Sequence, residues 1–281
     1  MAVVMDGVAL AKKVKAGVAA EVARMAKKPV LAVILVGEDP ASQIYVRHKQ
    51  KDCVECGIEG RGYILPADTP EEKLAELIDG LNRDADVDGI LLQLPLPKAL
   101  EEAKVRLLRR IDPEKDVDAF HPINVGRMLL GDVRFAPCTP AGIMALLDEY
   151  GVDPKGKRCV IIGRSDIVGK PTAILLMHRH GTITVCHTRT KNMPDIVREA
   201  EILVSAAGRR GLVTGDMLSP GVVIVDVAMN RDENGKLCGD VDRAAALEKA
   251  SYYTPVPGGV GPMTRAMLMR NTLTAAKLHG K

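Results

Sequence analysis

The sequence predicts an α/β protein of two domains, each built on a parallel sheet, with a cleft between them. Continuous apolar runs such as 30–36 and 159–162 are typical of strands buried on both faces of a parallel sheet. Helical patterns alternate with these runs along most of the chain. The length of 281 residues is enough for two domains of ordinary size.

Composition narrows the class of protein. Apolar residues make up 47% of the chain but aromatics only 2%, so aliphatic side chains and Met must fill the core. A formal charge of +3 is too small to indicate a nucleic-acid partner. The N-terminus does not resemble a signal peptide and no apolar run is long enough to span a membrane, so we expect no membrane association. Six cysteines without framework spacing suit a reducing cytoplasm.

The first half of the chain is expected to alternate helices with strands. Pro40 favours a helix start and Gly57 a helix stop, and Glu71 and Glu72 suit a first helical turn. The stretch 111–140 is rich in Pro, Gly and Asp and is expected to be irregular. The expected helices are 8–26, 40–56, 70–81 and 101–110, and the expected strands are 30–36, 63–65 and 90–94.

The second half is expected to repeat the alternation after a connecting helix over 141–150. Residues 254–262 are so rich in Pro and Gly that we expect neither helix nor central strand there, followed by a last helix over 263–278. The expected strands are 158–162, 182–186, 201–205 and 222–226.

A glycine turn directly after the apolar run 159–162 predicts a nucleotide site in a Rossmann-type sheet. Its pattern is Gly-x-Ser-x-x-x-Gly, from Gly163 to Gly169, between a buried strand and a helix. Backbone NH groups at such a helix start bind a pyrophosphate. The glycines alone are a weak signal, and an ordinary α/β turn remains the alternative.

The residues around this turn favour NADP over NAD. A NAD site usually carries Asp or Glu at the end of the second strand, whereas this chain has His187, Thr188 and Arg189 there. Together with Arg164 and Ser165, these residues suit an additional phosphate.

Tyr45 and Lys49 lie four residues apart, so they share one face of the expected helix. Alone, such a lysine would be interpreted as a solvated surface residue. Gln93 interrupts an apolar strand and costs free energy unless it is paired, which suggests that it points into a cleft. Asp118 lies in a charge-dense loop and suits a ligand contact and a helix cap equally well.

We expect no bound metal. Cys53-x-x-Cys56 could be a redox or zinc half-site, but no second pair completes one, so two small helical residues are the better interpretation. Asp166, Asp226 and Asp240 are weaker site candidates, because Asp is common at strand ends and turns.

Six segments, taken together and in order, resemble the FolD family of bifunctional methylenetetrahydrofolate dehydrogenases/cyclohydrolases over nearly the whole chain. These segments are 45–49, 88–97, 115–122, 137–140, 163–171 and 254–264. The resemblance implies that NADP oxidises 5,10-methylenetetrahydrofolate to the methenyl cation, which water opens to 10-formyltetrahydrofolate. It also implies a cytoplasmic homodimer in one-carbon metabolism, with a product used in purine biosynthesis.

The resemblance implies roles for individual residues. Lys49 is the principal residue for hydrolysis, Gln93 supports it, Tyr45 packs on the folate rings and Asp118 binds the pterin edge. Residues of the 254–262 loop form one wall of the implied folate site. The implied cofactor contacts lie in the glycine turn and after two later strands. The loop residues are Pro257, Gly258, Gly259 and Pro262; the cofactor contacts are Gly163, Arg164, Ser165, Thr188, Arg189 and Met229.

The implied folate-binding domain comprises residues 1–140 plus the C-terminal helix 262–281, and the implied NADP-binding domain comprises 141–261. Three departures from the family pattern are an acid at Asp166, Arg210 in place of a proline, and Ala228-Met229 in place of Gly-Ile. The acid at Asp166 leaves the NADP preference open.

Three alternative functions remain. A short-chain dehydrogenase also uses Tyr-x-x-x-Lys, but there the pair follows the glycine turn, whereas here it precedes it. A monofunctional methylenetetrahydrofolate dehydrogenase would lack cyclohydrolase activity, which the retained Lys49 and Gln93 argue against. A folate-binding regulator without activity would be expected to have lost Lys49.

Overall fold

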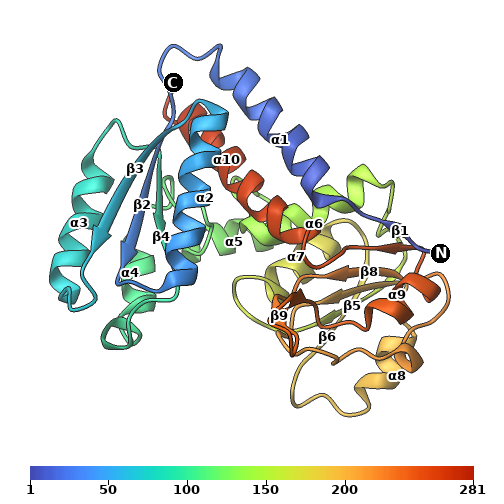
Figure 1. Cartoon of the computed structure of the whole chain (residues 1–281). Helices are drawn as coiled ribbons and strands as arrows, with labels where there is room; N and C mark the ends of the chain where they lie inside the picture. Colours follow the sequence, from blue (N-terminus) through green and yellow to red (C-terminus); the bar gives the residue numbers. More distant parts are fainter. The chain divides into compact units, whose positions relative to one another are not determined.

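The computed structural model describes residues 1–281, with only the backbone described at Ala41. The chain forms two compact units (Figure 1). The six-stranded unit comprises Met1–Ala11 and Thr139–Thr264, and the three-stranded unit comprises Lys12–Cys138 and Arg265–Lys281.

The three-stranded unit is built on a parallel sheet in which β2 is the central strand. Every residue of β2 is buried, because helices cover both faces of the sheet; Figure 1 shows α2 and α3 on opposite sides of it. The strands are β2 (Val30–Val36), β3 (Glu59–Leu65) and β4 (Gly89–Leu92). The helices are α2 (Pro40–Cys56), α3 (Glu71–Arg83), η1 (Lys98–Leu100), α4 (Lys104–Arg110) and α5 (Pro122–Leu130).

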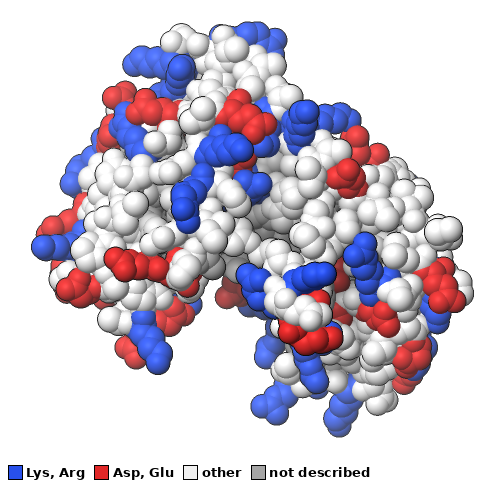
Figure 2. All heavy atoms as spheres, in the orientation of Figure 1, with Lys and Arg blue, Asp and Glu red and all other residues white. Residues whose placement is uncertain are grey.

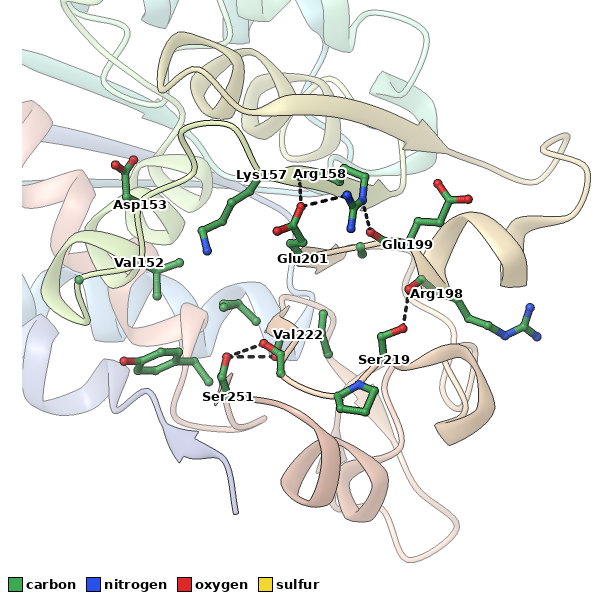
Figure 3. A pocket seen from close by; sticks show the side chains of 16 residues that line it. Val152, Asp153, Lys157, Arg158, Arg198, Glu199, Glu201, Ser219, Val222 and Ser251 are labelled. Atoms are coloured by element: carbon green, nitrogen blue, oxygen red, sulfur yellow. Dashed lines mark hydrogen bonds and ion pairs between the residues drawn. The ribbon is translucent and has the colours of Figure 1, made fainter.

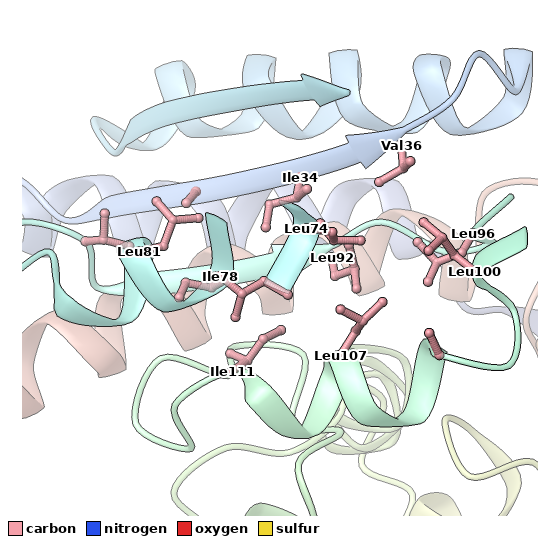
Figure 4. Packing of buried hydrophobic residues seen from close by; sticks show 14 of the residues in the cluster. Ile34, Val36, Leu74, Ile78, Leu81, Leu92, Leu96, Leu100, Leu107 and Ile111 are labelled. Atoms are coloured by element: carbon pink, nitrogen blue, oxygen red, sulfur yellow. The ribbon is translucent and has the colours of Figure 1, made fainter. Parts of the chain in front are cut away.

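One face of this sheet packs an entirely aliphatic core against α3 and α4 (Figure 4). Ile34 of β2 and Leu92 of β4 meet Leu74 and Ile78 of α3 and Leu107 of α4, all at most 2% exposed. Removing this apolar surface from water is the main favourable contribution to the stability of the unit. This packing also fixes the positions of the carboxyl ends of β2 and β4.

The six-stranded unit contains one sheet of parallel strands in the order β1-β11-β8-β7-β5-β6. β5 pairs with β6 on one side and with β7 on the other, so the chain order reverses at β5. In an open parallel sheet a crevice forms at this point, beyond the carboxyl ends of the strands. The strands are β1 (Val3–Val4), β5 (Arg158–Ile162), β6 (Thr182–Cys186), β7 (Ile202–Ser205), β8 (Val223–Asp226) and β11 (Tyr252–Tyr253).

Helices cover this sheet on both faces as well. Val197 of α8 and Ala246 of α9 pack with Val160, Leu203 and Ile224 on one face. The remaining elements are the helices α6 (Cys138–Glu149), α7 (Gly169–His178), α8 (Met193–Arg198), η2 (Gly215–Met217) and α9 (Arg243–Lys249) and the hairpin β9 (Asn230–Arg231) with β10 (Leu237–Cys238). Two helices, α1 (Gly7–Val22) and α10 (Val260–Leu278), contribute residues to both units.

Most expected elements are present, and the strands 30–36, 158–162 and 182–186 have the expected bounds. The expected helix 8–26 ends at Val22, and the expected strand 63–65 begins earlier, at Glu59. At the N-terminus, β1 pairs in parallel with β11. Residues 1–11 therefore belong to the six-stranded unit, whereas the sequence placed them with the N-terminal domain.

Two expectations about Pro-rich stretches are wrong. The stretch 111–140 contains α5, which begins at Pro122, is capped by the His121 ring accepting from the Ile123 NH at 3.1 Å, and ends at the left-handed Gly131. Likewise Pro262 lies in the first turn of α10, which begins at Val260. Proline is tolerated in a first turn because the NH that it lacks has no helical partner there.

The surface carries both signs of charge. On the face drawn in Figure 2, Lys and Arg side chains are interspersed with Asp and Glu over both units. No helix among the described residues is long and apolar enough to cross a membrane.

Candidate active site

Helix α2 presents Tyr45 and Lys49. The Asp39 carboxylate accepts a hydrogen bond from the Ser42 NH at 2.7 Å, Pro40 occupies the first turn, and the left-handed Gly57 ends the helix. Both side chains are half-buried and lie one turn apart on the same face. The caps define the ends of α2, and the four-residue spacing places the ring and the amine on one face.

Gln93 is the hydrogen-bond partner of Lys49. The Lys49 Nζ donates to Gln93 Oε1 at 2.9 Å. Gln93 follows directly after β4, where its NH donates to the Ile34 carbonyl at 2.8 Å and its Nε2 to the Leu94 carbonyl at 2.6 Å. Because the Gln93 Nε2 donates to a backbone carbonyl, the amide oxygen is oriented toward Lys49.

The loop that carries Asp118 is anchored by a buried lysine. Lys115 is 7% exposed, and its Nζ donates to the carbonyls of Leu81, Asn82 and Asp84 at 2.7–3.0 Å. These carbonyls lie at the end of α3, where helical NH partners run out. Burial lowers the pKa of Lys115, and nearby carboxylates oppose this change.

A second anchor lies on α10. The Asn271 Nδ2 donates to the Val117 carbonyl at 2.8 Å and to the Ala136 carbonyl at 3.0 Å. Ala119 has a left-handed backbone (φ 59°), which is strained for a residue with a Cβ. The hydrogen bonds from Asn271 hold the loop in this strained conformation. They therefore help to fix the position of the neighbouring Asp118.

The charge of Lys49 acts on the Asp118 carboxyl. Burial raises the pKa of Asp118, whereas the Lys49 charge and a 3.5 Å hydrogen bond from the Cys138 thiol lower it. Burial also raises the pKa of Tyr45, and the charge of Arg265 opposes this. The three-stranded unit thus brings together an amine, an amide oxygen and a carboxyl.

The six-stranded unit contains a separate cavity of about 490 Å³ at the carboxyl ends of β5, β6 and β7. This is the crevice that the reversal of strand order predicts. Two arginines line it, and no Asp or Glu does so among the described side chains. Its walls are Ile162, Gly163, Arg164 and Ser165 after β5, His187, Thr188, Thr190 and Met193 after β6, and Ala206, Ala207, Arg209 and Leu212 after β7.

Close backbone contacts explain the two glycines of the turn. Gly163 has φ 121°, and a Cβ there would lie 2.5 Å from the Ala206 carbonyl oxygen. A Cβ at Gly169 would lie 2.2 Å from the Gly163 oxygen. The Ser165 hydroxyl accepts from the NH groups of Val168 and Gly169 at 3.2 and 3.3 Å, directly before α7.

The structure places some of the predicted cofactor contacts together and not others. Gly163, Arg164, Ser165 and Thr188 line the cavity, whereas Arg189 does not. Met229, after β8, is also outside the lining and is 54% exposed. Asp166 is exposed and forms an ion pair with Lys170.

The predicted loop residues belong to the six-stranded unit. Pro257, Gly258 and Gly259 precede α10, with Gly258 at φ 107° and the Gly259 NH donating to the Pro255 carbonyl at 2.8 Å. Pro262 lies within α10. Tyr45, Lys49, Gln93 and Asp118 belong to the three-stranded unit.

Sequence reasoning missed the turn Ala206–Arg209. It follows β7, the strand next to β5, so the rule that ligands bind where strand order reverses could have found it. The supporting residues Lys115, Cys138 and Asn271 were also missed, because their roles depend on contacts between distant segments.

The Cys53-x-x-Cys56 pair does not have the properties of a redox or metal site. Burial raises the pKa of both thiols to about 12, and thiolates are the reactive and metal-binding form. In the described part of the chain, no group of three or more His, Cys, Asp or Glu is placed to hold a metal ion.

A second cavity of about 400 Å³ lies at the opposite, amino edge of the six-stranded sheet (Figure 3). Its walls mix both signs of charge: Arg158 is 3.5 Å from Glu201, and Lys157 lies nearby. Ser251 donates to the carbonyls of Gly221 and Val222.

Comparison with known proteins gives a consistent result for both halves of the chain. Residues 5–118 match the family described as tetrahydrofolate dehydrogenase/cyclohydrolase, catalytic domain. Residues 137–280 match the NAD(P)-binding domain of the same family. Among curated relatives, the bifunctional protein FolD of Acetivibrio thermocellus is 53% identical, with 99% of this chain and 98% of the relative covered. FolD of Magnetococcus marinus is 52% identical over the same shares.

Solved structures show the same similarity. The bifunctional FolD of Campylobacter jejuni is 47% identical, with a TM-score of 0.95 and 99% of each chain covered. FolD of Trypanosoma brucei, solved with NADP cofactor and an inhibitor, is 40% identical, with a TM-score of 0.94 and coverage of 100% of this chain and 99% of that one.

Gly163→Ala is expected to weaken binding of a nicotinamide dinucleotide by at least about tenfold, because the new Cβ would push Ala206 away from the cavity. Gly221→Ala is the matched control: Gly221 also has positive φ (84°), but open space surrounds its Cβ position. Titration by cofactor fluorescence measures both. An equal loss of affinity in the two variants would show that the loss comes from the strain of a positive φ and not from the close approach of the new Cβ to Ala206.

A pH effect on stability is expected from Asp226, which is fully buried and accepts from the NH groups of Asp240 and Val241. Burial raises its pKa from 3.8 to about 6. An acid with a raised pKa contributes stability that is fully present below its unfolded pKa and is lost as pH rises through its folded pKa.

Wild type should therefore gain about 1.4 kcal/mol of unfolding free energy relative to Asp226→Asn as pH falls from about 8 to about 5. Denaturant unfolding at both pH values measures the difference, and Asp68→Asn, at an exposed position, is the control. A wild-type minus Asp226→Asn difference that does not change with pH would contradict the assignment.

Proposed function

We propose a two-step folate reaction for this chain, which belongs to the tetrahydrofolate dehydrogenase/cyclohydrolase family. The enzyme oxidises 5,10-methylenetetrahydrofolate to 5,10-methenyltetrahydrofolate with NADP, and then hydrolyses the methenyl cation to 10-formyltetrahydrofolate. The observation that carries the proposal is the 2.9 Å hydrogen bond between Lys49 and Gln93.

The cavity of the six-stranded unit suits NADP. Its two arginines favour phosphate groups, and none of the described side chains that line it is acidic. Gly163 lets the backbone approach closely, and Arg164, Ser165 and Thr188 are the proposed contacts together with Arg189 and Met229. When bound, NADP accepts a hydride from the methylene carbon of the folate.

Oxidation demands little acid–base chemistry from the chain, because hydride transfer depends mainly on alignment of the two carbon centres. Hydrolysis differs, because water must lose a proton as its oxygen bonds to the methenyl carbon, and N5 must gain one as its bond to that carbon breaks. In this proposal Lys49 takes one proton from the attacking water and gives it to N5 as the bond between N5 and the carbon breaks. The hydroxyl of the tetrahedral intermediate loses its remaining proton to solvent as the formyl C=O forms.

Gln93 and Asp118 have different roles in this proposal. Gln93 holds the Lys49 amine at 2.9 Å and so aims it at the reacting carbon. Asp118 accepts hydrogen bonds from the amino-pyrimidinone edge of the pterin, which carries several donors. Tyr45 packs on the folate rings, and the folate is also walled by Pro257, Gly258, Gly259 and Pro262.

We further propose a cytoplasmic homodimer whose 10-formyl product enters purine biosynthesis. The sequence resemblance supports the dimer and the pathway. The six cysteines, which are all free thiols, support a reducing compartment. A monofunctional dehydrogenase is not favoured, because the Lys49–Gln93 pair has no use in hydride transfer.

One assay tests the function. The protein is supplied with 5,10-methylenetetrahydrofolate and either NADP or NAD, and methenyl absorbance and reduced cofactor are followed together. Reduced cofactor with only transient methenyl supports both steps. Reduced cofactor with methenyl that decays at the spontaneous rate would indicate a monofunctional enzyme. Absence of reduced cofactor would leave only folate binding.

Lys49→Ala should lose hydrolysis almost completely, by about a hundredfold or more, because no other group would move the proton. Oxidation should be retained, since it needs no proton transfer from the chain. Lys51→Ala, two residues along α2 and exposed, is the control and should behave as wild type. Methenyl decay in stopped-flow measures the effect. Hydrolysis by Lys49→Ala near the wild-type rate would remove lysine from the mechanism.

Gln93→Ala should slow hydrolysis by about tenfold, because the Lys49 amine would lose its fixed position without losing its chemistry. The folate KM should change less than kcat. Steady-state hydrolysis of added methenyltetrahydrofolate measures both constants. A variant that loses only folate affinity would indicate that Gln93 binds the substrate and does not position the lysine.

A further inference from the structure

The turn after β7 is bound by a carboxylate from a distant segment, which the proposed reaction does not use. Asp240 is fully buried. Its Oδ2 accepts from the Ser205 hydroxyl at 2.9 Å and from the NH groups of Ala207 and Gly208 at 2.8 and 3.3 Å. Its Oδ1 accepts from the Arg209 NH at 2.7 Å. A fifth donor, the Asn230 Nδ2, reaches Oδ1 at 3.0 Å.

Three successive backbone NH groups that converge on one anion form a nest, an arrangement that often binds a phosphate. Here the chain supplies the anion itself, from a segment some thirty residues further on. The nest is therefore closed to a ligand. Its effect is to hold the backbone of residues 207–209 at one edge of the cofactor cavity.

Arg209 is the residue that this turn presents. Its NH is fixed by Asp240, but its exposed guanidinium forms no hydrogen bond or ion pair with any side chain that the structure describes. It lines the cavity after β7, whereas Arg164 lines it after β5. An unpaired guanidinium in a cavity without described acids suits a phosphate.

We propose that Asp240 is a positioning residue that clamps the turn 207–209, so that Arg209 binds a phosphate of the cofactor. The proposal rests on the proposed function, because it takes NADP as the ligand. It adds two residues to cofactor recognition, one that contacts the dinucleotide and one that acts only through the first.

The chemistry of Asp240 provides a nearly isosteric test. In Asp240→Asn, either orientation of the amide turns an NH₂ group toward NH donors: toward Ala207 and Gly208, or toward Arg209 and Asn230. The turn should loosen, and NADPH should bind about tenfold more weakly or worse. The cofactor KM should rise by a similar factor, with kcat at saturating cofactor and the folate KM little changed.

Asp242→Ala is the matched control. Asp242 is two residues away and also accepts from backbone NH groups, but these belong to Ala244 and Ala245 at the start of α9. This variant should lose stability without losing NADPH affinity. NADPH fluorescence titration of both variants, with thermal unfolding alongside, separates the clamp from a general loss of stability.

Arg209→Ala, alone and combined with Asp240→Asn, tests whether Asp240 acts through Arg209. If Asp240 acts through Arg209, then Arg209→Ala should weaken NADPH by a similar factor, and Asp240→Asn should add little to it. Fully additive losses would overturn the positioning role, and wild-type affinity in either single variant would overturn the proposal. Should Asp240→Asn fail to fold, hydrogen exchange at residues 207–209 of wild type replaces it: slow exchange supports the clamp, and fast exchange refutes it.

Competition with smaller ligands identifies which phosphate of NADP Arg209 binds. If Arg209→Ala weakens 2′,5′-ADP more than ADP, Arg209 binds the 2′-phosphate; equal loss for both points to the 5′-phosphate that is part of the pyrophosphate. An equal loss for adenosine, which has no phosphate, would overturn the role of the guanidinium. Failure of wild type itself to bind NADPH would instead refute the cofactor in the proposed function.

Discussion

Burial of the parallel strands on both faces is the constraint on which the rest of the structure depends. Strands such as β2 and β7 consist of buried residues and cannot carry polar groups without a cost in free energy. Residues that could bind a ligand or take part in a reaction therefore lie in the loops at the carboxyl ends of the strands. Gln93 after β4, Gly163 after β5 and Arg209 after β7 all occupy such positions.

Several buried polar groups in these units are satisfied by partners from distant segments. Lys115 caps the end of α3 with three hydrogen bonds, and Asp240 gathers five donors. Asp88, also fully buried, accepts from the Val30 NH and from Lys281 near the chain end. Each pairing connects segments far apart in sequence, so the same bonds that offset desolvation also fix the loops that carry function.

Local signals predicted much of this architecture because they act over a few residues. The start of α2 at Pro40, its end at Gly57 and the buried strand 30–36 follow from backbone preferences and apolar continuity. β1 and α5 were missed for different reasons. Two residues at Val3–Val4 become a strand only because β11 lies beside them. α5 has the same local signals as α2, Pro122 at its start and Gly131 at its end, but the Pro and Gly content of the stretch was interpreted as irregular structure.

The sequence by itself determined the chemistry: which residues carry an amine, an amide and a carboxyl, and the Gly-x-Ser-x-x-x-Gly turn that suits a phosphate. Those properties belong to single residues or short spacings. Tertiary structure decided which groups meet, because contacts such as Lys49 with Gln93, or Asp240 with residues 207–209, join segments that only folding brings together. It also left Arg189 and Met229 outside the cavity lining, although Thr188 and Thr190 on either side of Arg189 line it, because the path of the folded loop determines which side chains face the cavity.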